Sequence, residues 1–351
     1  MDVIKIVNQI PAGFQSTDGL KLINQGDTLS DWEAKRTVIK EKWLDFLGQP
    51  PYERFIPKVQ ESSWEEHDNF IGKLVYIQTE PDYYEKTYLL IPKNLKEKNP
   101  AMLVLYYDID TMIGENRGGD HFMDTPNRFF ALELVKRGYV VQVMRWFYQG
   151  YKDDSYGYTG LSDKQKTAYQ SFYGENYLKG VARINKIYPG LKGLAKVSND
   201  ASYTLDYLSA LPYVDNDLIG VIGHSLGGKM SLYVAAFDKR IKASVISELG
   251  IGISFCNWDA PWYLGEEVKE PGFNLDHHQL LGLIAPRPVL LLAGDDSDNN
   301  ASWHYINAAK EVYNLYGKKD AIGLYNHHCG HEPQKQAMSL AYDWLDYYLK
   351  V

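Results

Sequence analysis

The sequence contains a serine between two glycines, in a pattern suited to nucleophilic chemistry. Residues 218–228 read Leu-Ile-Gly-Val-Ile-Gly-His-Ser-Leu-Gly-Gly, so Gly223 and Gly227 lie two positions before and after Ser225. A nucleophilic serine stands on a sharp turn between a strand and a helix, where side chains at those two positions would clash. The apolar run before Ser225 and the helical pattern after it supply that context. The segment therefore predicts a nucleophile beside helix amides that favour developing negative charge.

A serine hydroxyl needs a neutral imidazole nearby to take its proton. His331 has the most suitable place among the nine histidines, because residues 329–333 (Cys-Gly-His-Glu-Pro) lie between the last predicted strand and a terminal amphipathic helix. His277 and His278 are interpreted as structural. The histidines and the two cysteines lack the spacing of a zinc site. We therefore expect His331 to be the base, with no metal bound.

The third group must be a carboxylate that orients the imidazole and stabilises its positive charge. Two predicted strands end near acidic residues, and the chain order Ser, acid, His fits Asp298 and Asp296 on the later one. The customary position of the acid, three residues after Gly294, is Ser297, so Asp296 and Asp298 each miss it by one residue. Glu248 follows the earlier strand, where a buried carboxylate would be costly without a function. Asp298 is our first choice, with Glu248 and Asp296 as alternatives.

Two backbone amides are expected to bind the oxyanion that forms during attack on a carbonyl. One belongs to Leu226, the residue after the nucleophile. The second should follow the predicted strand 102–107, where Asp108 is the nearest candidate donor.

Several side chains near predicted strand ends are candidates for binding a substrate. Arg145 would pair either with a substrate carboxylate or with a nearby aspartate of the protein. Trp146, Trp258 and Trp262 would line a pocket, since aromatic rings stack on flat, hydroxyl-rich ligands, although ordinary core packing explains them equally well.

From residue 101 onward, short apolar runs alternate with helix-length segments, which predicts a parallel sheet with crossover helices. Two earlier runs separated by Pro81-Asp82 predict an antiparallel hairpin. About eight strands result, at 73–79, 87–91, 102–107, 139–144, 218–222, 243–246, 289–292 and 321–325. Helices are predicted at 129–136, 194–208, 226–237, 301–316 and 334–348.

The remaining segments suggest additions to one α/β domain. Residues 1–60 are interpreted as a helical appendage, with a capping box at Ser30-Asp31-Trp32-Glu33 and a helix that ends at Gly48. Residues 61–351 form the predicted catalytic domain. Segments at about 148–189 and 250–286 are expected to be insertions over the carboxyl edge of the sheet, where open α/β sheets bind ligands.

The composition excludes several classes of function. The 351 residues are 45% hydrophobic and carry a net charge of −8, which argues against a nucleic-acid partner. No apolar run is long enough to cross a bilayer, so no membrane partner is expected. The N-terminus lacks the pattern of a signal peptide, which predicts a cytoplasmic protein unless a signal was removed, in which case it would be periplasmic or secreted. The oligomeric state is left open.

From about residue 71 onward, the chain resembles the α/β-hydrolase superfamily, especially its acetyl xylan esterase-like and dienelactone hydrolase-like members. The likeness rests on residues 223–228 and on Gly330-His331. Residues 276–288 are similar to a segment of glucuronoyl esterases, in which a glutamate after the sixth strand can serve as the acid, as Glu248 would. Those esterases usually carry an arginine where this chain has Leu226.

The resemblance implies an α/β-hydrolase fold and a serine esterase that works through an acyl-enzyme without a cofactor. We expect an esterified, and preferably acetylated, carbohydrate or a small ester as the substrate. A glucuronoyl-type uronate esterase, a prolyl oligopeptidase-like peptidase and a catalytically silent binding protein remain alternatives. About 70 residues before the core are too few for the propeller that such peptidases normally carry.

Overall fold

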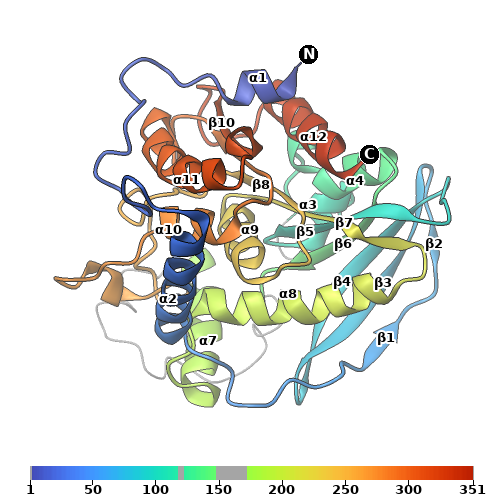
Figure 1. Cartoon of the computed structure of the whole chain (residues 1–351). Coiled ribbons are helices and arrows are strands. Elements are labelled where there is room, and N and C mark those ends of the chain that lie inside the picture. The colour runs from blue at the N-terminus through green and yellow to red at the C-terminus, as the bar shows by residue number, and fades with distance from the viewer. Residues whose placement is uncertain (1, 118–121, 148–171, 351) are drawn as a thin grey trace.

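A computed structural model of the chain describes residues 2–117, 122–147 and 172–350. These residues form one twisted ten-stranded sheet with helices on both faces (Figure 1). The strand order is β1-β3-β4-β6-β5-β7-β8-β9-β10, and β2 pairs with β3 outside this path. The predicted α/β-hydrolase architecture is confirmed.

The sheet is antiparallel at one end and parallel at the other. Strands β1, β2, β3 and β4 pair in antiparallel fashion, and β4 is also antiparallel to β6, whereas all pairs from β6 through β10 are parallel. The strands are β1 (Val59–Glu61), β2 (Glu65–Glu66), β3 (Phe70–Glu80), β4 (Tyr83–Pro92), β5 (Asn99–Tyr106), β6 (Val140–Arg145), β7 (Val214–His224), β8 (Ala243–Ser247), β9 (Val289–Ala293) and β10 (Ile322–Asn326).

All eight predicted strands are present, and β1 and β2 are additional. These two have three and two residues, and four of the five are exposed, so they carry no apolar pattern that a sequence reading could detect. They exist because β3 is long enough to offer them its free edge.

Helices cover the sheet on both sides (Figure 1). Because the strands from β6 to β10 are parallel, their carboxyl ends lie at one edge of the sheet. The helices are α1 (Val3–Val7), α2 (Leu29–Leu47), α3 (Ile109–Ile113), α4 (Phe130–Lys136), α7 (Phe172–Ile187), α8 (Gly193–Ala210), α9 (Leu226–Phe237), α10 (His277–Ile284), α11 (Trp303–Leu315) and α12 (Lys335–Leu349), with short 3-10 turns η1 (Pro126–Arg128), η2 (Glu266–Lys269), η3 (Asn300–Ser302) and η4 (Lys319–Ala321). The five predicted helices of the core correspond to α4, α8, α9, α11 and α12.

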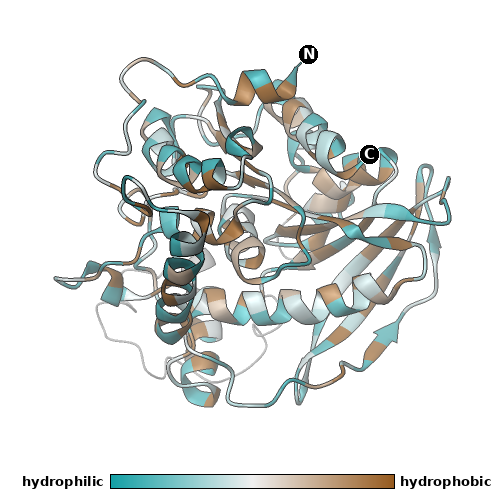
Figure 2. Cartoon of the chain, in the orientation of Figure 1, coloured by the Kyte–Doolittle hydropathy of each residue, from teal (hydrophilic) through white to brown (hydrophobic). Residues whose placement is uncertain are grey.

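Two apolar layers hold the helices to the sheet, one on each face. In β5, Leu103 and Leu105 belong to the layer under α8 and α9, whereas Met102 and Val104 belong to the layer under α4 and α12. Successive side chains of a strand point to opposite faces, so a strand buried on both faces must be apolar throughout. Figure 2 shows this apolar character in the central strands, whereas α2 carries mostly hydrophilic residues on its outer surface.

The N-terminal appendage packs on the core through few apolar side chains. Trp32 and Trp43 of α2 are fully buried, and Trp43 Nε1 donates to Gln279 Oε1 at 3.0 Å. The predicted start of this helix was two residues late, because Thr28 is the N-cap and forms the capping box with Asp31. The predicted end at Gly48 is confirmed, and the domain boundary at residue 60 stays a prediction.

The two predicted insertions differ in how much of them is described. Residues 148–171 of the first lie outside the described residues, and its remainder contains α7. The second consists of turns, η2 and α10, and lies after β8 at the carboxyl edge of the sheet. None of the helices in the described ranges is long and apolar enough to span a bilayer.

Candidate active site

Ser225 lies on the turn between β7 and α9, with φ 56° and ψ −118°. A non-glycine residue in this region is strained, which is typical of functional turns. A Cβ on Gly223 would come within 2.2 Å of the Gly227 carbonyl oxygen, and one on Gly227 within 2.0 Å of the Leu105 carbonyl oxygen. Both glycines are therefore sterically required for the turn that presents Ser225.

The structure brings His331 to Ser225. His331 Nε2 lies 2.9 Å from Ser225 Oγ, within hydrogen-bonding distance. The loop that carries the imidazole is tied to the end of β9, because His327 N donates to the Ala293 carbonyl and Gly330 N donates to the Gly294 carbonyl. The histidine that follows the last strand is thus positioned to accept the serine proton.

Glu248 follows β8 and reaches the other side of the imidazole. Its carboxylate is fully buried, and Oε2 lies 3.3 Å from His331 Nδ1. The Gly294 amide donates to Oε1 and the Ser297 amide donates to Oε2 at 2.8 Å. Backbone donors of this kind stabilise the ionised carboxylate and fix its direction. Ser225, His331 and Glu248 thus form a continuous hydrogen-bonded chain.

Asp296 offers a second carboxylate to the same imidazole nitrogen. Its Oδ2 lies 2.9 Å from His331 Nδ1, but its side chain is 54% exposed. Nδ1 carries one proton, so the two carboxylates compete for it. Solvent screens the exposed group, whereas the buried Glu248 interacts at lower effective dielectric. Burial therefore favours Glu248 as the orienting carboxylate, although the Asp296 oxygen lies nearer to Nδ1.

Asp298, the first choice from sequence, is not brought to His331. Its fully buried carboxylate accepts hydrogen bonds from the amides of Gly250 and Ile251, both at 2.8 Å, and from Ser302 Oγ at 2.9 Å. All its acceptor contacts are therefore directed at the loop after β8 and at η3. The structure corrects this prediction: Asp298 supports the backbone and does not orient the base.

The predicted oxyanion donors begin α9 and α3, and a residue that the sequence analysis missed lies beside Ser225. Leu226 is the first residue of α9, so its amide has no partner within the helix. Asp108 begins α3 as its N-cap, with its carboxylate bonded to Thr111. Tyr107 Oη lies 3.3 Å from Ser225 Oγ. The amide roles of Leu226 and Asp108 stay predictions, and the Tyr107 hydroxyl is an additional donor within reach.

Tyr107→Phe is expected to lower kcat for ester hydrolysis about 10²-fold, the effect typical of losing one oxyanion donor. KM should change little, because the bond strengthens as charge develops in the transition state. Steady-state kinetics beside Tyr139→Phe, which removes a hydroxyl bonded to Asp346 on α12, provide the matched control. An unchanged kcat in Tyr107→Phe would remove the hydroxyl from the oxyanion site.

Arg145 is occupied by the protein itself. Its Nε donates to Glu85 Oε1 at 2.8 Å, and the Glu85 side chain is fully buried. Removing the arginine from a buried carboxylate would be costly, so its Nε is held against Glu85. The internal ion pair that was the alternative is present, but its partner is Glu85 and not the expected aspartate.

The three tryptophans predicted to line a pocket lie in the core. Trp146 and Trp258 are fully buried and Trp262 is 5% exposed. Trp258 packs against His277, with ring centroids 4.1 Å apart. The prediction that these rings present a surface to substrate is wrong, and the packing interpretation holds.

Two buried histidines have structural roles. His277 Nδ1 lies 2.9 Å from the Ile251 carbonyl, and burial lowers the pKa of its imidazole to about 3. His224 lies beside the base, with its ring centroid 4.8 Å from that of His331. Burial holds the pKa of His224 well below its usual range. A neutral His224 adds no like charge when His331 takes up a proton.

Arg128 links the base loop to the end of β5, a contact that the sequence analysis missed. Its NH2 group lies 2.6 Å from Glu332 Oε2, and its NH1 group donates to Tyr106 Oη at 2.6 Å. Glu332 and Tyr106 are the immediate neighbours of His331 and Tyr107. The buried guanidinium therefore connects the base to the tyrosine donor.

Glu248, Asp296 and His331 place one potential ligand atom each within 4.8 Å of one another, a grouping that could bind a cation. The same atoms also orient the imidazole bonded to Ser225. Both carboxylates face the Nδ1 side of this imidazole, and the expectation that no metal binds stays a prediction.

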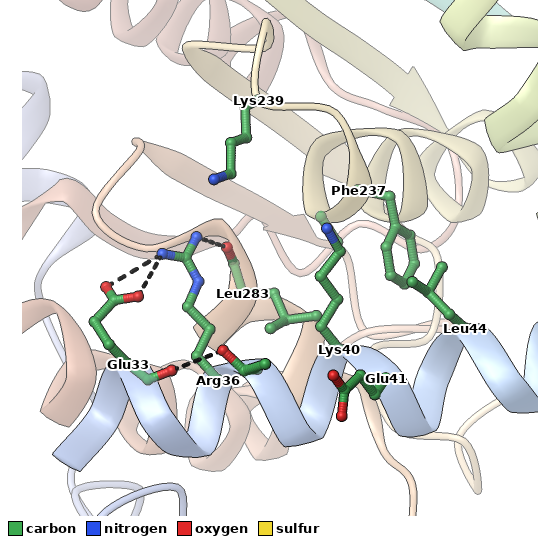
Figure 3. Close-up of a pocket in the computed structure, with 10 residues that line it drawn as sticks. Glu33, Arg36, Lys40, Glu41, Leu44, Phe237, Lys239 and Leu283 are labelled. Carbon is green, nitrogen blue, oxygen red and sulfur yellow. Dashed lines mark hydrogen bonds and ion pairs between the residues drawn. The ribbon is translucent and has the colours of Figure 1, made fainter. Parts of the chain in front are cut away.

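A cavity of about 390 Å³ lies elsewhere, between α2 and the end of α9 (Figure 3). Arg36, Lys40 and Lys239 border it, and Arg36 is bonded to Glu33 and to the Leu283 carbonyl. The whole length of α9, about 18 Å, separates its lining from Ser225. This cavity is therefore distinct from the candidate active site.

Comparisons with known proteins agree with this fold. Residues 86–247 match the dienelactone hydrolase family. A Bacillus subtilis (strain 168) protein named as a hydrolase, YtaP, is 25% identical over 83% of this chain and 91% of its own. The 4-O-methyl-glucuronoyl methylesterase 1 of Sodiomyces alcalophilus is 29% identical over 36% of this chain, which spans only 32% of that enzyme.

The fold also matches a solved structure, the glucuronoyl esterase from Solibacter usitatus. The TM-score is 0.70 at 17% sequence identity, over 96% of this chain and 98% of that one. The resemblance inferred from the sequence is confirmed. This chain is therefore an α/β-hydrolase-fold protein whose residues 86–247 match the dienelactone hydrolase family.

Proposed function

We propose that this chain is a serine-dependent carboxylic ester hydrolase that works through an acyl-enzyme. The observation that carries the proposal is the hydrogen-bonded chain from Ser225 Oγ through His331 to the buried Glu248. A nucleophile, a base and an orienting carboxylate in this order are the requirements of acyl transfer by serine. The Ser225 turn and the match to the dienelactone hydrolase family support it.

The proposed reaction has two steps that use the same groups. Ser225 Oγ attacks the ester carbonyl while His331 Nε2 takes the hydroxyl proton, and Glu248 stabilises the imidazolium. The Leu226 amide and the Tyr107 hydroxyl donate to the oxyanion. The ester C–O bond then breaks and the alcohol leaves with the proton from His331. Water, activated by the same imidazole, hydrolyses the acyl-enzyme and restores Ser225.

We further propose that the substrate is an ester of a carbohydrate, preferably an acetylated sugar. The relative from Sodiomyces alcalophilus is named a glucuronoyl methylesterase, and the Solibacter usitatus structure is titled a glucuronoyl esterase. Methyl esters of glucuronic acid are therefore the alternative substrate. The side chain of Leu226 is fully buried. The arginine that glucuronoyl esterases usually carry at this position is absent, which favours the acetyl ester.

Three esters separate these possibilities in one kinetic experiment: p-nitrophenyl acetate, acetylated xylo-oligosaccharide and benzyl glucuronate. We expect kcat/KM to be about 10-fold or more higher on the acetylated sugar than on the aryl ester, because sugar contacts contribute binding energy to the transition state. Ser225→Ala measured on the same esters is the control.

Each outcome changes a different part of the proposal. A preference for benzyl glucuronate would replace the acetyl ester by the uronate ester. Equal turnover of all three would remove the carbohydrate and leave a general esterase. A chain that hydrolyses none of them and leaves Ser225 unlabelled by a fluorophosphonate would be the catalytically silent alternative.

A further inference from the structure

The peptide group that joins Leu249 to Gly250 lies between two buried charges. Lys229 Nζ donates to the Leu249 carbonyl at 2.6 Å. The Asp298 carboxylate accepts the Gly250 amide at 2.8 Å, and its other oxygen accepts the Ile251 amide at the same distance. A cation therefore faces the carbonyl end of one peptide dipole and an anion faces its amide end. This peptide begins directly after Glu248.

Both charges are held where charges are costly. Lys229, on α9, is 3% exposed, and burial lowers the pKa of its ammonium group to about 8. Asp298 is fully buried, and burial raises the pKa of its carboxyl group to about 6. Ions persist in such places only where several polar groups compensate them. The two side chains come from α9 and from the loop after β9, and both bond to this peptide.

Further contacts complete the grip on this loop. Trp258 Nε1 donates to the Gly250 carbonyl at 2.7 Å, and Lys229 Nζ lies 3.7 Å from the centroid of the same indole ring. A cation at this distance is attracted by the ring face. Gly250 has φ +73°, and a Cβ there would come within 2.5 Å of Cys256 Cβ. The loop after β8 is thus fixed at every backbone polar group from the Leu249 carbonyl to the Ile251 amide.

Glu248, the residue before this peptide, has a backbone conformation that these contacts stabilise. Glu248 has φ +48°, a left-handed conformation that is unfavourable for a residue with a side chain. On its other side Glu248 N is fixed by a hydrogen bond to the Leu292 carbonyl of β9. A strained residue keeps its conformation only when its surroundings determine it from both sides.

We propose that Lys229 and Asp298 are positioning residues that hold the Leu249–Gly250 peptide from its two ends and thereby keep Glu248 directed at His331. The inference rests on the proposed esterase function and adds the support of its acid. It also gives the buried Lys229 a role. The carboxylate that sequence order favoured as the acid becomes a support for the acid.

A double-mutant cycle with Glu248 tests this role. Lys229→Met is expected to lower kcat roughly 10- to 100-fold with KM within about 2-fold, the range typical of groups that support a catalytic side chain. In a Glu248→Gln background, Lys229→Met should lower kcat by less than about 3-fold relative to Glu248→Gln alone, because the effects of coupled residues are not additive. Asp298→Asn should behave in the same way. Lys229→Arg, which keeps the cation, should recover part of kcat.

Asp276→Asn is the matched control, because Asp276 is also a largely buried carboxylate that accepts backbone amides, those of Ile253 and His277. It should lower the melting temperature and leave kcat unchanged. If Lys229→Met does not fold, Trp258→Phe, which removes the bond to the Gly250 carbonyl, takes its place with the same expectation.

Additive losses in the cycle would overturn the inference, as would a raised KM at constant kcat, which would make Lys229 a substrate contact. The Ser225→Ala variant separates a failure of the esterase proposal from a failure of the positioning role. Activity that survives in Ser225→Ala would defeat the esterase proposal itself, whereas an inactive Ser225→Ala with an additive cycle would defeat the positioning role alone.

Discussion

Replacing Ser225 by alanine is expected to lower kcat for ester hydrolysis by about 10⁴- to 10⁶-fold, as in other serine hydrolases that lose the nucleophile. The hydroxyl is well placed to form the acyl-enzyme, since it lies 2.9 Å from His331 Nε2 and on the strained turn before α9. The alanine should fit without a clash, so the melting temperature should stay close to that of the wild type. Single-turnover kinetics with p-nitrophenyl acetate measure the loss.

The companion variants are His331→Ala and the double variant. Because the two groups act as one unit, His331→Ala should lose about as much activity as Ser225→Ala, and the double variant little more than either. Residual activity within about 10-fold of the wild type in Ser225→Ala would contradict acyl transfer through this residue. Mass spectrometry after fluorophosphonate treatment should find the adduct on Ser225 in the wild type only.

Replacing Glu248 by glutamine is expected to lower kcat by about 10³- to 10⁴-fold, which is the loss seen when the orienting carboxylate of a triad becomes neutral. The carboxylate is fully buried and accepts hydrogen bonds from the amides of Gly294 and Ser297, so solvent cannot compensate for the loss of its charge. Asp296→Asn should cost less than about 10-fold, because solvent screens a side chain that is 54% exposed. Both variants should bind substrate with nearly unchanged KM.

The comparison of these two variants decides which carboxylate orients the base. A larger loss in Asp296→Asn than in Glu248→Gln would transfer the role to Asp296. Equal small losses, with a large loss only in the double variant, would mean that either carboxylate suffices. Asp295→Asn is the matched control, since the Asp295 carboxylate bonds to Asn326 at the end of β10 and to His328 on the loop after it.

The acid of the triad illustrates why the position of a residue after a predicted strand can mislead. Asp298 comes from the expected strand end, but the chain turns back there, with Asp295 N donating to the Asp298 carbonyl and φ +71° at Asp295. The turn directs the Asp298 carboxylate at the loop after β8 and leaves Asp296 toward the imidazole. Direction at a tight turn depends on backbone dihedrals that neighbouring loops impose, so spacing alone cannot give it.

The aromatic residues illustrate a second limit. Trp146, Trp258 and Trp262 occur in segments rich in turns, where a binding surface was a reasonable expectation. Tryptophan serves equally in cores and at binding surfaces. The structure buries all three: Trp258 packs against Lys229 and His277, and the other two rings pack against Tyr177 and Tyr263. Burial of this kind depends on long-range packing that local composition does not encode.

The sequence by itself determined the features whose cause is local. The glycines around Ser225 indicate a tight turn between a strand and a helix that presents the nucleophile. The apolar runs after residue 100 indicate a parallel sheet buried on both faces. The place of His331 between the last strand and α12 follows from chain order along that sheet. Tertiary structure alone decided which carboxylate meets His331 Nδ1, that Arg145 is paired with Glu85, and that Tyr107 joins the site. These contacts connect residues distant in sequence, and they depend on strand adjacency and loop direction, which only the packed chain fixes.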